Sequence, residues 1–456
     1  MADKQEMKMT EVEAAKVPLG MKFGYGVGDF AFCLGYQVCA LYLLYFFTDV
    51  FMLPVGIAGM IFMGSKIWDA IVDPIIGTIS DHTNSRWGRK RPFLLFGAIP
   101  LGLVTFLLFY GPHLSLNMKI VYAAATFIIF SSAIATVNVP YGALTADMTL
   151  DTKERSGVTG FRMTFALLGT LFAAAATKPL ASLFPNEAIG FRWIGAIYGI
   201  IIAIIVLITF STVRERVKYV DLEEKLPFFE NLKVIFLNGP FLLLAGGVTL
   251  YMAAVNLLAI IVVYFFKYNL HKENLVSIAF IALFVTAAVF IPAFIWLSNK
   301  KSKKFGFNVG MLMLMASLTG MYFVPGDNLY AIFVLFFIAG IGMSTVFLFP
   351  WAMVPDTVEY SEWKTGLRRE GTIYGVYFLC MKIGSAISGY VAGTGLSHFG
   401  FIANVQQTEQ TLGGIRLLIS FIPIVFIVLG MILIFFYPID SAYHKRILDE
   451  LETRGK

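Results

Sequence analysis

The string PYGALTAD (residues 140–147) recurs in altered form as PWAMVPD (residues 350–356), and each copy closes a long apolar run with an aspartate. The two prolines are 210 positions apart and the two aspartates 209. A second pair of strings follows other apolar runs at a similar offset, SDHTNSRWGRKRP (80–92) and SNKKSKKFGF (298–307). Similar strings at equivalent joints predict an internal repeat in which one half of the chain is a structural copy of the other.

Twelve apolar runs surround these joints, each close to the roughly 20 residues that a membrane helix needs. The chain of 456 residues is 58% hydrophobic and only 14% charged, whereas soluble domains carry about 25% charged residues. The expected spans are 23–48, 55–80, 93–111, 119–145, 158–184, 190–212, 240–266, 274–297, 307–325, 328–350, 372–396 and 413–437.

These runs predict an all-α membrane protein with twelve transmembrane helices in two pseudo-symmetric six-helix halves, the major facilitator fold. The expected parts are an N-tail at 1–22, a bundle at 23–212, a central loop at 213–239, a second bundle at 240–437 and a C-tail at 438–456.

The basic residues predict the orientation of the spans. Of the 35 Lys and Arg residues, 26 fall in the tails and in joints on one side, four fall on the other side and five fall within spans. Because positive residues gather on the cytoplasmic side, both termini are expected in the cytoplasm. We expect a multi-pass protein of the cytoplasmic (inner) membrane without a cleavable signal peptide.

Three charged side chains share one face of the second span, in the string KIWDAIVDP. Asp69 and Asp73 are four positions apart, and Lys66 precedes Asp69 by three. Each charge at a helix centre costs roughly 2.5–3.5 kcal/mol, which makes such residues functional candidates. Two close carboxylates either share a cation or hold a proton, and oxygen ligands suit a hard cation such as Na⁺. The pattern predicts a cation site at Asp69 and Asp73; the alternative is that Lys66 only neutralises one carboxylate.

Other charges lie inside separate spans: Asp29 in the first, Arg162 near the start of the fifth and Lys382 about three turns into the eleventh. One acid and two bases from different helices are expected to meet in a central polar cavity. Arg162 lies near enough to the interface to reach water instead. Lys178 and Arg416, near the outer ends of their spans, are expected to extend to the interface.

The cytoplasmic joints hold a further set of charges. A solvated loop is the simplest interpretation, since exposed ion pairs are worth little one at a time. A network over several joints could instead latch one face of the protein in one state and release it in another. The candidate gate residues are Asp81, Arg86, Arg89, Glu154, Arg155, Asp356, Glu359, Glu362, Arg368 and Arg369.

Four stretches resemble the glycoside–pentoside–hexuronide:cation symporter family, the melibiose permease type within the major facilitator superfamily, and the resemblance covers essentially the whole chain. They are GYGVGDFA (24–31), WDAIVDP with SRWGRKRPF (68–93), NVPYGAL (138–144) and PDTVEYSEWKTGLRREG (355–371) running on to Lys382. The resemblance implies a cation site at Asp69 and Asp73 with Lys382 nearby. It implies a sugar site that includes Asp29, Arg162 and Asn138, with Lys66 in the place of a family arginine.

Two positions depart from the melibiose permease pattern. Asn138 stands in the place of an aspartate and Gly142 in the place of a tryptophan. Because a carboxylate and an aromatic platform are missing, we do not expect specificity for an α-galactoside. The resemblance implies a glycoside, pentoside or hexuronide as the sugar. Tyr141 or Trp351 could stack on the sugar ring, although aromatic residues at span ends more often serve packing. We expect a monomer without cofactor or nucleic-acid partner, coupled to H⁺ or Na⁺, and the neutral Asn138 favours H⁺.

Two other functions are compatible with parts of the sequence. The apolar composition permits transport of an amphipathic or lipid-like solute, which would need a wide apolar cavity. The string DAIVD is similar to the aspartate-rich Mg²⁺ motifs of membrane prenyltransferases, but those enzymes need a second such motif on another span, and none occurs. No Ser/His/Asp set, metal-ligand spacing or nucleotide-binding loop appears either. We therefore predict a transporter and not an enzyme.

Overall fold

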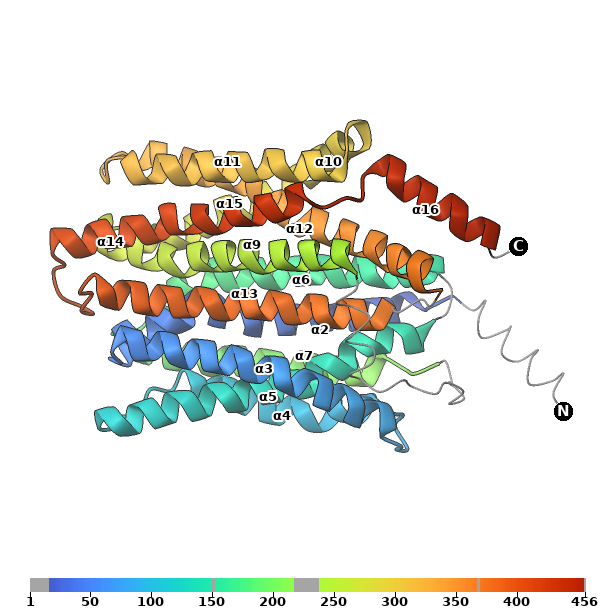
Figure 1. Cartoon of the computed structure of the whole chain (residues 1–456). Coiled ribbons are helices and arrows are strands. Elements are labelled where there is room, and N and C mark those ends of the chain that lie inside the picture. The colour runs from blue at the N-terminus through green and yellow to red at the C-terminus, as the bar shows by residue number, and fades with distance from the viewer. Residues whose placement is uncertain (1–15, 150–151, 217–237, 367–369, 455–456) are drawn as a thin grey trace. The chain divides into compact units, whose positions relative to one another are not determined.

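The computed structural model describes residues 16–149, 152–216, 238–366 and 370–454, and these residues form helices joined by short turns and loops (Figure 1). Twelve helices within these ranges are long and apolar enough to cross a membrane, which confirms the predicted all-α architecture. Fourteen α-helices are described, of which α14 and α15 together make the last span and α16 is not among the spans. They are α2 (Leu19–Val38), α3 (Val55–His82), α4 (Arg91–Leu108), α5 (Leu116–Met148), α6 (Thr152–Ala181), α7 (Glu187–Thr212), α9 (Gly239–Tyr264), α10 (Val276–Lys300), α11 (Lys303–Phe323), α12 (Leu329–Thr365), α13 (Glu370–His398), α14 (Glu409–Ile419), α15 (Phe421–Phe435) and α16 (Ser441–Arg454).

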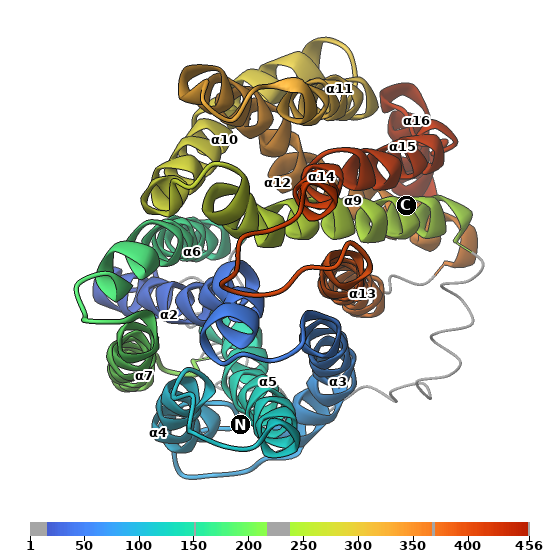
Figure 2. The same ribbon diagram turned by 90° about the vertical axis from the view of Figure 1, so that its left-hand side faces the viewer.

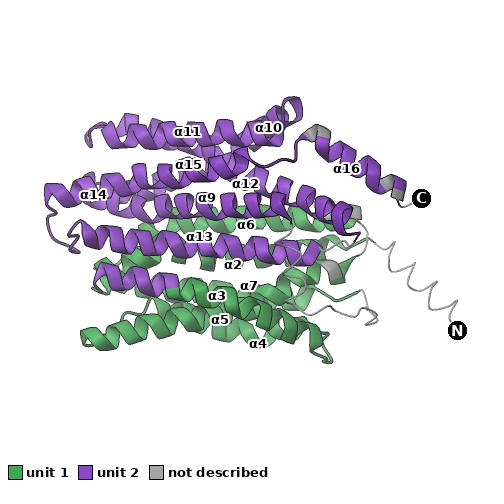
Figure 3. Cartoon of the chain, viewed as in Figure 1, with its two compact units in different colours: residues 1–53, 64–222 green, residues 54–63, 223–456 purple. Residues whose placement is uncertain are grey.

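The chain folds into two compact units (Figure 3). Unit 1 comprises residues 1–53 and 64–222, and unit 2 comprises residues 54–63 and 223–456. The start of α3 groups with unit 2 because Gly59 packs directly on Gly393 of α13, where a Cβ on Gly59 would lie 2.8 Å from the Gly393 Cα. The rest of α3 is held in unit 1 by Ser65, whose hydroxyl donates to the carbonyl of Phe127 on α5 (3.2 Å).

Neighbouring helices inside each unit pack over long lengths. In unit 1, α2 packs against α6, and α4 against α7, as the end-on view in Figure 2 shows. In unit 2, α9 packs against α13 and α15, and α11 against α12. Small residues permit the closest of these approaches. At the α4–α7 crossing, a Cβ on Gly199 would lie 2.3 Å from the carbonyl oxygen of Gly102.

We expect Gly199→Ala to lower the unfolding temperature of the detergent-purified protein, because the added methyl must push α7 away from the α4 backbone. Overpacking of this kind costs about 1–3 kcal/mol. The matched control is Gly160→Ala on α6, where a Cβ would meet nothing within 4 Å. That control should be neutral or slightly stabilising, because alanine favours a helix by up to about 1 kcal/mol. Equal melting curves for the two variants would contradict the close packing.

The first long helix of each half ends in the same way. α2 continues through π-helical turns at Cys39–Leu43 and Phe46–Val50, and α9 continues through one at Phe265–Asn269. The backbone bonds that close the two ends are Phe51 N to Phe46 O, Leu53 N to Phe47 O, Leu270 N to Phe265 O and Lys272 N to Phe266 O. Met52 and His271 then adopt positive φ angles of 60° and 52°. Both ends therefore share a bonding pattern and a left-handed residue, as an internal repeat requires.

Candidate functional site

A buried ion pair joins two helices inside unit 1. Arg162 on α6 donates through Nε to Asp29 Oδ2 of α2 (2.5 Å) and through Nη2 to Asp29 Oδ1 (3.2 Å). The side chains are only 19% and 10% exposed. Arg162 therefore turns toward the bundle interior and does not extend to the interface. The bidentate geometry fixes the guanidinium plane as well as its charge.

Two tyrosines hold this ion pair in place. The hydroxyl oxygen of Tyr141 on α5 lies 2.9 Å from Asp29 Oδ2 and 2.6 Å from the carbonyl oxygen of Tyr25, so its proton can be donated to either acceptor. The Arg162 guanidinium carbon is 5.1 Å from the centre of the Tyr141 ring and 5.3 Å from that of Tyr25, within the range of cation–π attraction. Both rings are fully buried. The pair is thus set in a rigid polar pocket with aromatic walls.

A second group of charges lies on α3. Asp69 is buried, and Asp73 and Lys66 are half-buried, all within the part of α3 that belongs to unit 1. Tyr36 of α2 connects them: the Lys66 ammonium is 5.4 Å from its ring centre, and both carboxylates act electrostatically on its hydroxyl.

Asn138 of α5 approaches the Tyr36 hydroxyl and acts on it electrostatically. Tyr36 follows Asp29 by seven positions on α2, so a helix places both on one face. Unit 1 thus brings together the residues predicted for the two sites. Lys382 lies half-buried on α13 in unit 2, and its place beside the carboxylate pair stays a prediction.

The first joint of unit 1 forms a charge cluster around Lys90, a residue absent from the predicted gate set. Its ammonium lies 3.3 Å from Asp147 and 3.7 Å from Asp81, and Arg89 lies 3.9 Å from Asp147. Burial raises the pKa of Asp147, and Lys90 opposes that shift. Glu215 caps α4 by accepting from the backbone N–H groups of residues 89–91, which places a negative charge at the positive end of the helix dipole.

The remaining gate candidates of unit 1 have local partners. Glu154 pairs with Lys22 (2.8 Å), Arg155 donates to the carbonyl of Thr149 (3.2 Å), and the Arg86 guanidinium lies 4.1 Å from the centre of the Trp87 ring. Arg368 and Arg369, predicted for the second unit, lie outside the described residues. A latch that spans several joints stays a prediction.

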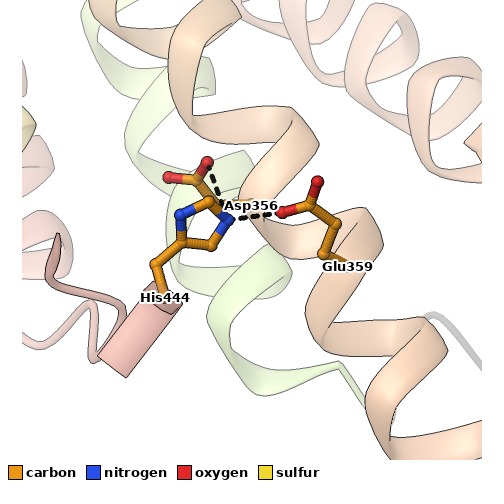
Figure 4. A group of neighbouring side chains, drawn as sticks. All are labelled: Asp356, Glu359 and His444. Atoms are coloured by element: carbon orange, nitrogen blue, oxygen red, sulfur yellow. Dashed lines mark hydrogen bonds and ion pairs between the residues drawn. The ribbon is translucent and has the colours of Figure 1, made fainter. Parts of the chain in front are cut away.

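The corresponding joint of unit 2 repeats the arrangement. Lys303 at the start of α11 contacts both oxygens of Asp356 at 2.8 Å, as Lys90 contacts Asp147. His444 of α16 pairs with Glu359 and lies 3.6 Å from Asp356 Oδ1 (Figure 4). The two carboxylates and the imidazole offer potential ligand atoms that all lie within 4.8 Å of one another. Because the Lys303 ammonium already pairs with both oxygens of Asp356, we interpret these side chains as an ion-pair cluster and not as a metal centre. Glu362, also predicted here, accepts from Gly366 N through its carbonyl and closes α12.

One sequence expectation is wrong. Lys178 does not extend to the interface: its side chain is 7% exposed, pairs with Glu187 and donates to the hydroxyl of Tyr45 (3.2 Å). Glu187 begins α7 and its side chain is 37% exposed, so its carboxylate offers Lys178 a partner at the helix end that hydropathy alone does not reveal.

An apolar cavity of about 390 Å³ also occurs in unit 1. It is lined by Thr83, Pro92, Phe93, Phe96, Gly97, Pro100, Ala133 and Thr136. None of these is a predicted site residue, and none carries a charge that could respond to a cation. The cavity is therefore a poor candidate for a cation-coupled substrate site.

Comparison with solved structures supports the fold. The chain matches a bacterial homologue of the human lysosomal transporter Spinster with a TM-score of 0.70 at 16% identity, covering 94% of this chain and 97% of the other. It matches the nucleoside transporter NupG with a TM-score of 0.68 at 12% identity, covering 91% and 99%. At such identities the likeness concerns the fold alone.

Sequence comparison identifies the family. A family model described as MFS/sugar transport protein matches residues 24–441. The chain is 37% identical to the uncharacterized symporter YnaJ of Bacillus subtilis (strain 168), covering 98% of each chain. It is 30% identical to the isoprimeverose transporter of Lactiplantibacillus pentosus (95% and 91% covered) and to the inner membrane symporter YicJ of Escherichia coli K12 (95% of each). The chain therefore belongs to the MFS/sugar transport protein family as a multi-pass, cation-coupled symporter, and it is not an enzyme.

Proposed function

We propose that this symporter imports a glycoside, pentoside or hexuronide together with H⁺ or Na⁺ by alternating access. The Asp29–Arg162 pair carries the proposal. Buried ion pairs contribute little net stability, and apolar residues often replace them without loss. A pair retained inside a membrane bundle is therefore best explained by a polar ligand that it binds.

The polar groups of unit 1 suit sugar hydroxyls. A hydroxyl would donate to Asp29, and others would accept from Arg162 and Asn138. The Tyr141 ring is fully buried, so Tyr141 would orient Asp29 rather than stack on the sugar. Lys66, whose ammonium lies beside Tyr36, would neutralise part of the negative charge of the α3 carboxylates next to the sugar site.

The cation would bind at Asp69 and Asp73, with Lys382 as a third group that modulates their charge. Binding of the cation would favour binding of the sugar, and the coupling must be reciprocal. Tyr36 supports this coupling, since the charges of both carboxylates act on its hydroxyl and Asn138 lies near the same hydroxyl. We place the protein in the cytoplasmic membrane as a monomer with both termini inside. Its two halves, 23–212 and 240–437, would move relative to each other.

Uptake into vesicles tests substrate and ion together. We expect a sugar in a panel of glycosides, pentosides and hexuronides to accumulate under an imposed pH gradient in Na⁺-free buffer, and a protonophore to abolish this accumulation. H⁺ is favoured because Asn138 leaves the cavity with one carboxylate fewer. Stimulation by Na⁺ without any protonophore effect would reassign the ion. Uptake of amphipathic solutes but of no sugar would overturn the proposed substrate class.

A further inference from the structure

The tail helix α16 packs against the end of α12 and is held there by several specific contacts. In Figure 1 the helix extends from the end of α15, and it packs on α12. The connection is buried at Tyr437 and Ile439, and Lys304 of α11 donates to the carbonyl of Tyr437 (3.3 Å). The Asp440 side chain accepts from Tyr443 N (2.8 Å) and caps the helix. The start of α16 is therefore held firmly in unit 2.

Two further contacts join α16 to α12. Near the start of α16, His444 pairs with Glu359 and faces Asp356 (Figure 4). Six residues on, Glu450 accepts from the indole N–H of Trp363 (2.7 Å). The two attachments are four positions apart on α12, so they lie on one face of that helix. The tail helix therefore clamps the segment 356–365, which follows two prolines inside α12, Pro350 and Pro355. Such prolines remove backbone hydrogen bonds from the helix and let it bend there, so we call 356–365 the hinge segment.

The charges at the first attachment balance only when the imidazole is protonated. Asp356 and Glu359 carry two negative charges, and Lys303 supplies one positive charge. The other groups nearby are the neutral Tyr437, whose pKa is raised by burial and then by Asp356, and two opposite charges. These are Lys304, whose ammonium donates to the Tyr437 carbonyl, and Asp440, whose carboxylate caps its own helix. A neutral His444 would leave one carboxylate uncompensated in a cluster where Asp356 is 7% and Glu359 22% exposed.

We propose that α16 is a proton-sensitive latch, in which protonated His444 holds the hinge segment of α12 to the tail and loss of the proton releases it. Imidazoles change charge between about pH 5 and pH 8, so a latch of this kind responds to pH changes near neutrality. The latch would let the proton concentration inside the cell set the mobility of the end of α12. A divalent cation is a weaker occupant, because it would have to bind beside the Lys303 ammonium and would leave the cluster with a net positive charge.

Hydrogen–deuterium exchange of the full-length protein in detergent tests the latch without any need for substrate. We compare labelling at about pH 6 and about pH 8, with times scaled for the intrinsic rate. In the unsubstituted protein we expect peptides covering 356–365 to exchange about fivefold faster at the higher pH. His444→Lys keeps the charge and should stay protected at both pH values. His444→Gln should exchange fast at both.

His398→Gln, at the far end of α13 in the same unit, is the matched control and should keep the pH dependence. Glu359→Gln removes the carboxylate that pairs with the protonated His444, so in this variant the exchange of 356–365 should not depend on pH. Two results would overturn the latch. One is pH-independent exchange at 356–365 in the unsubstituted protein. The other is a change of protection on adding a chelator, which would assign the cluster to a metal. Because exchange is read without transport, either result leaves the proposed function to be judged separately.

Discussion

Asp73→Asn should reduce concentrative uptake to simple equilibration. One charge moving down about 100 mV supplies about 2.3 kcal/mol, enough for roughly 50-fold accumulation. The amide removes one of the two carboxylates that would carry the ion, so the gradient no longer drives the sugar. Accumulation in energised vesicles measures the effect, and exchange of labelled for unlabelled sugar at equilibrium should survive.

Asp327→Asn is the control for the charge change, because Asp327 lies exposed in the loop before α12. It should accumulate sugar like the unsubstituted protein. An Asp73→Asn protein that concentrates sugar as well as this control would place the cation site elsewhere.

Arg162→Gln should abolish both transport and sugar binding. It leaves Asp29 as an uncompensated charge inside the bundle, which costs about 3–5 kcal/mol. We therefore expect a lower unfolding temperature together with loss of the thermal stabilisation that bound sugar gives to the unsubstituted protein. Arg192→Gln on α7 removes a guanidinium whose carbon lies 4.5 Å from the centre of the Tyr110 ring, and this variant should retain sugar binding.

The double variant Asp29→Asn/Arg162→Gln separates stability from function. With both charges gone, the unfolding temperature should recover, since the buried penalty disappears. Binding and transport should remain absent, because the groups that recognise the hydroxyls are lost. A double variant that transports sugar would show that the pair serves only the fold.

The helices were predictable where hydrophobicity determines them, and their ends were less so. α12 is predicted to end near residue 350 and continues to Thr365. Hydropathy marks where the membrane ends, whereas a helix continues as long as its backbone bonds and neighbours favour it. The last span is predicted as one run and is divided at Ser420 into α14 and α15. The apolar sequence there is continuous, so nothing in its hydropathy indicated the break.

The sequence predicted which residues belong to the candidate site better than it predicted which of them contact each other. Asp69 and Asp73 are neighbours through helical spacing alone. Asp29 and Arg162 are 133 positions apart, and only the cost of their charges marked them as candidates. The sequence did not distinguish Lys90 and Lys303 from other lysines, because basic residues are common in the joints between spans. The signal was present in the repeated aspartates Asp147 and Asp356, each of which lies against one of these lysines.

The twin endings of α2 and α9 show that the two halves share a frame and differ in chemistry. The same two backbone bonds and a non-glycine left-handed residue occur at equivalent places in both halves. Counting back from the helix prolines Pro74 and Pro292, the places of Asp69 and Asp73 fall on Ala287 and Ile291. The backbone is thus repeated, while the pair of acids at these places is found in the first half alone. An ion bound there would break the symmetry of the scaffold and give the two halves different tasks.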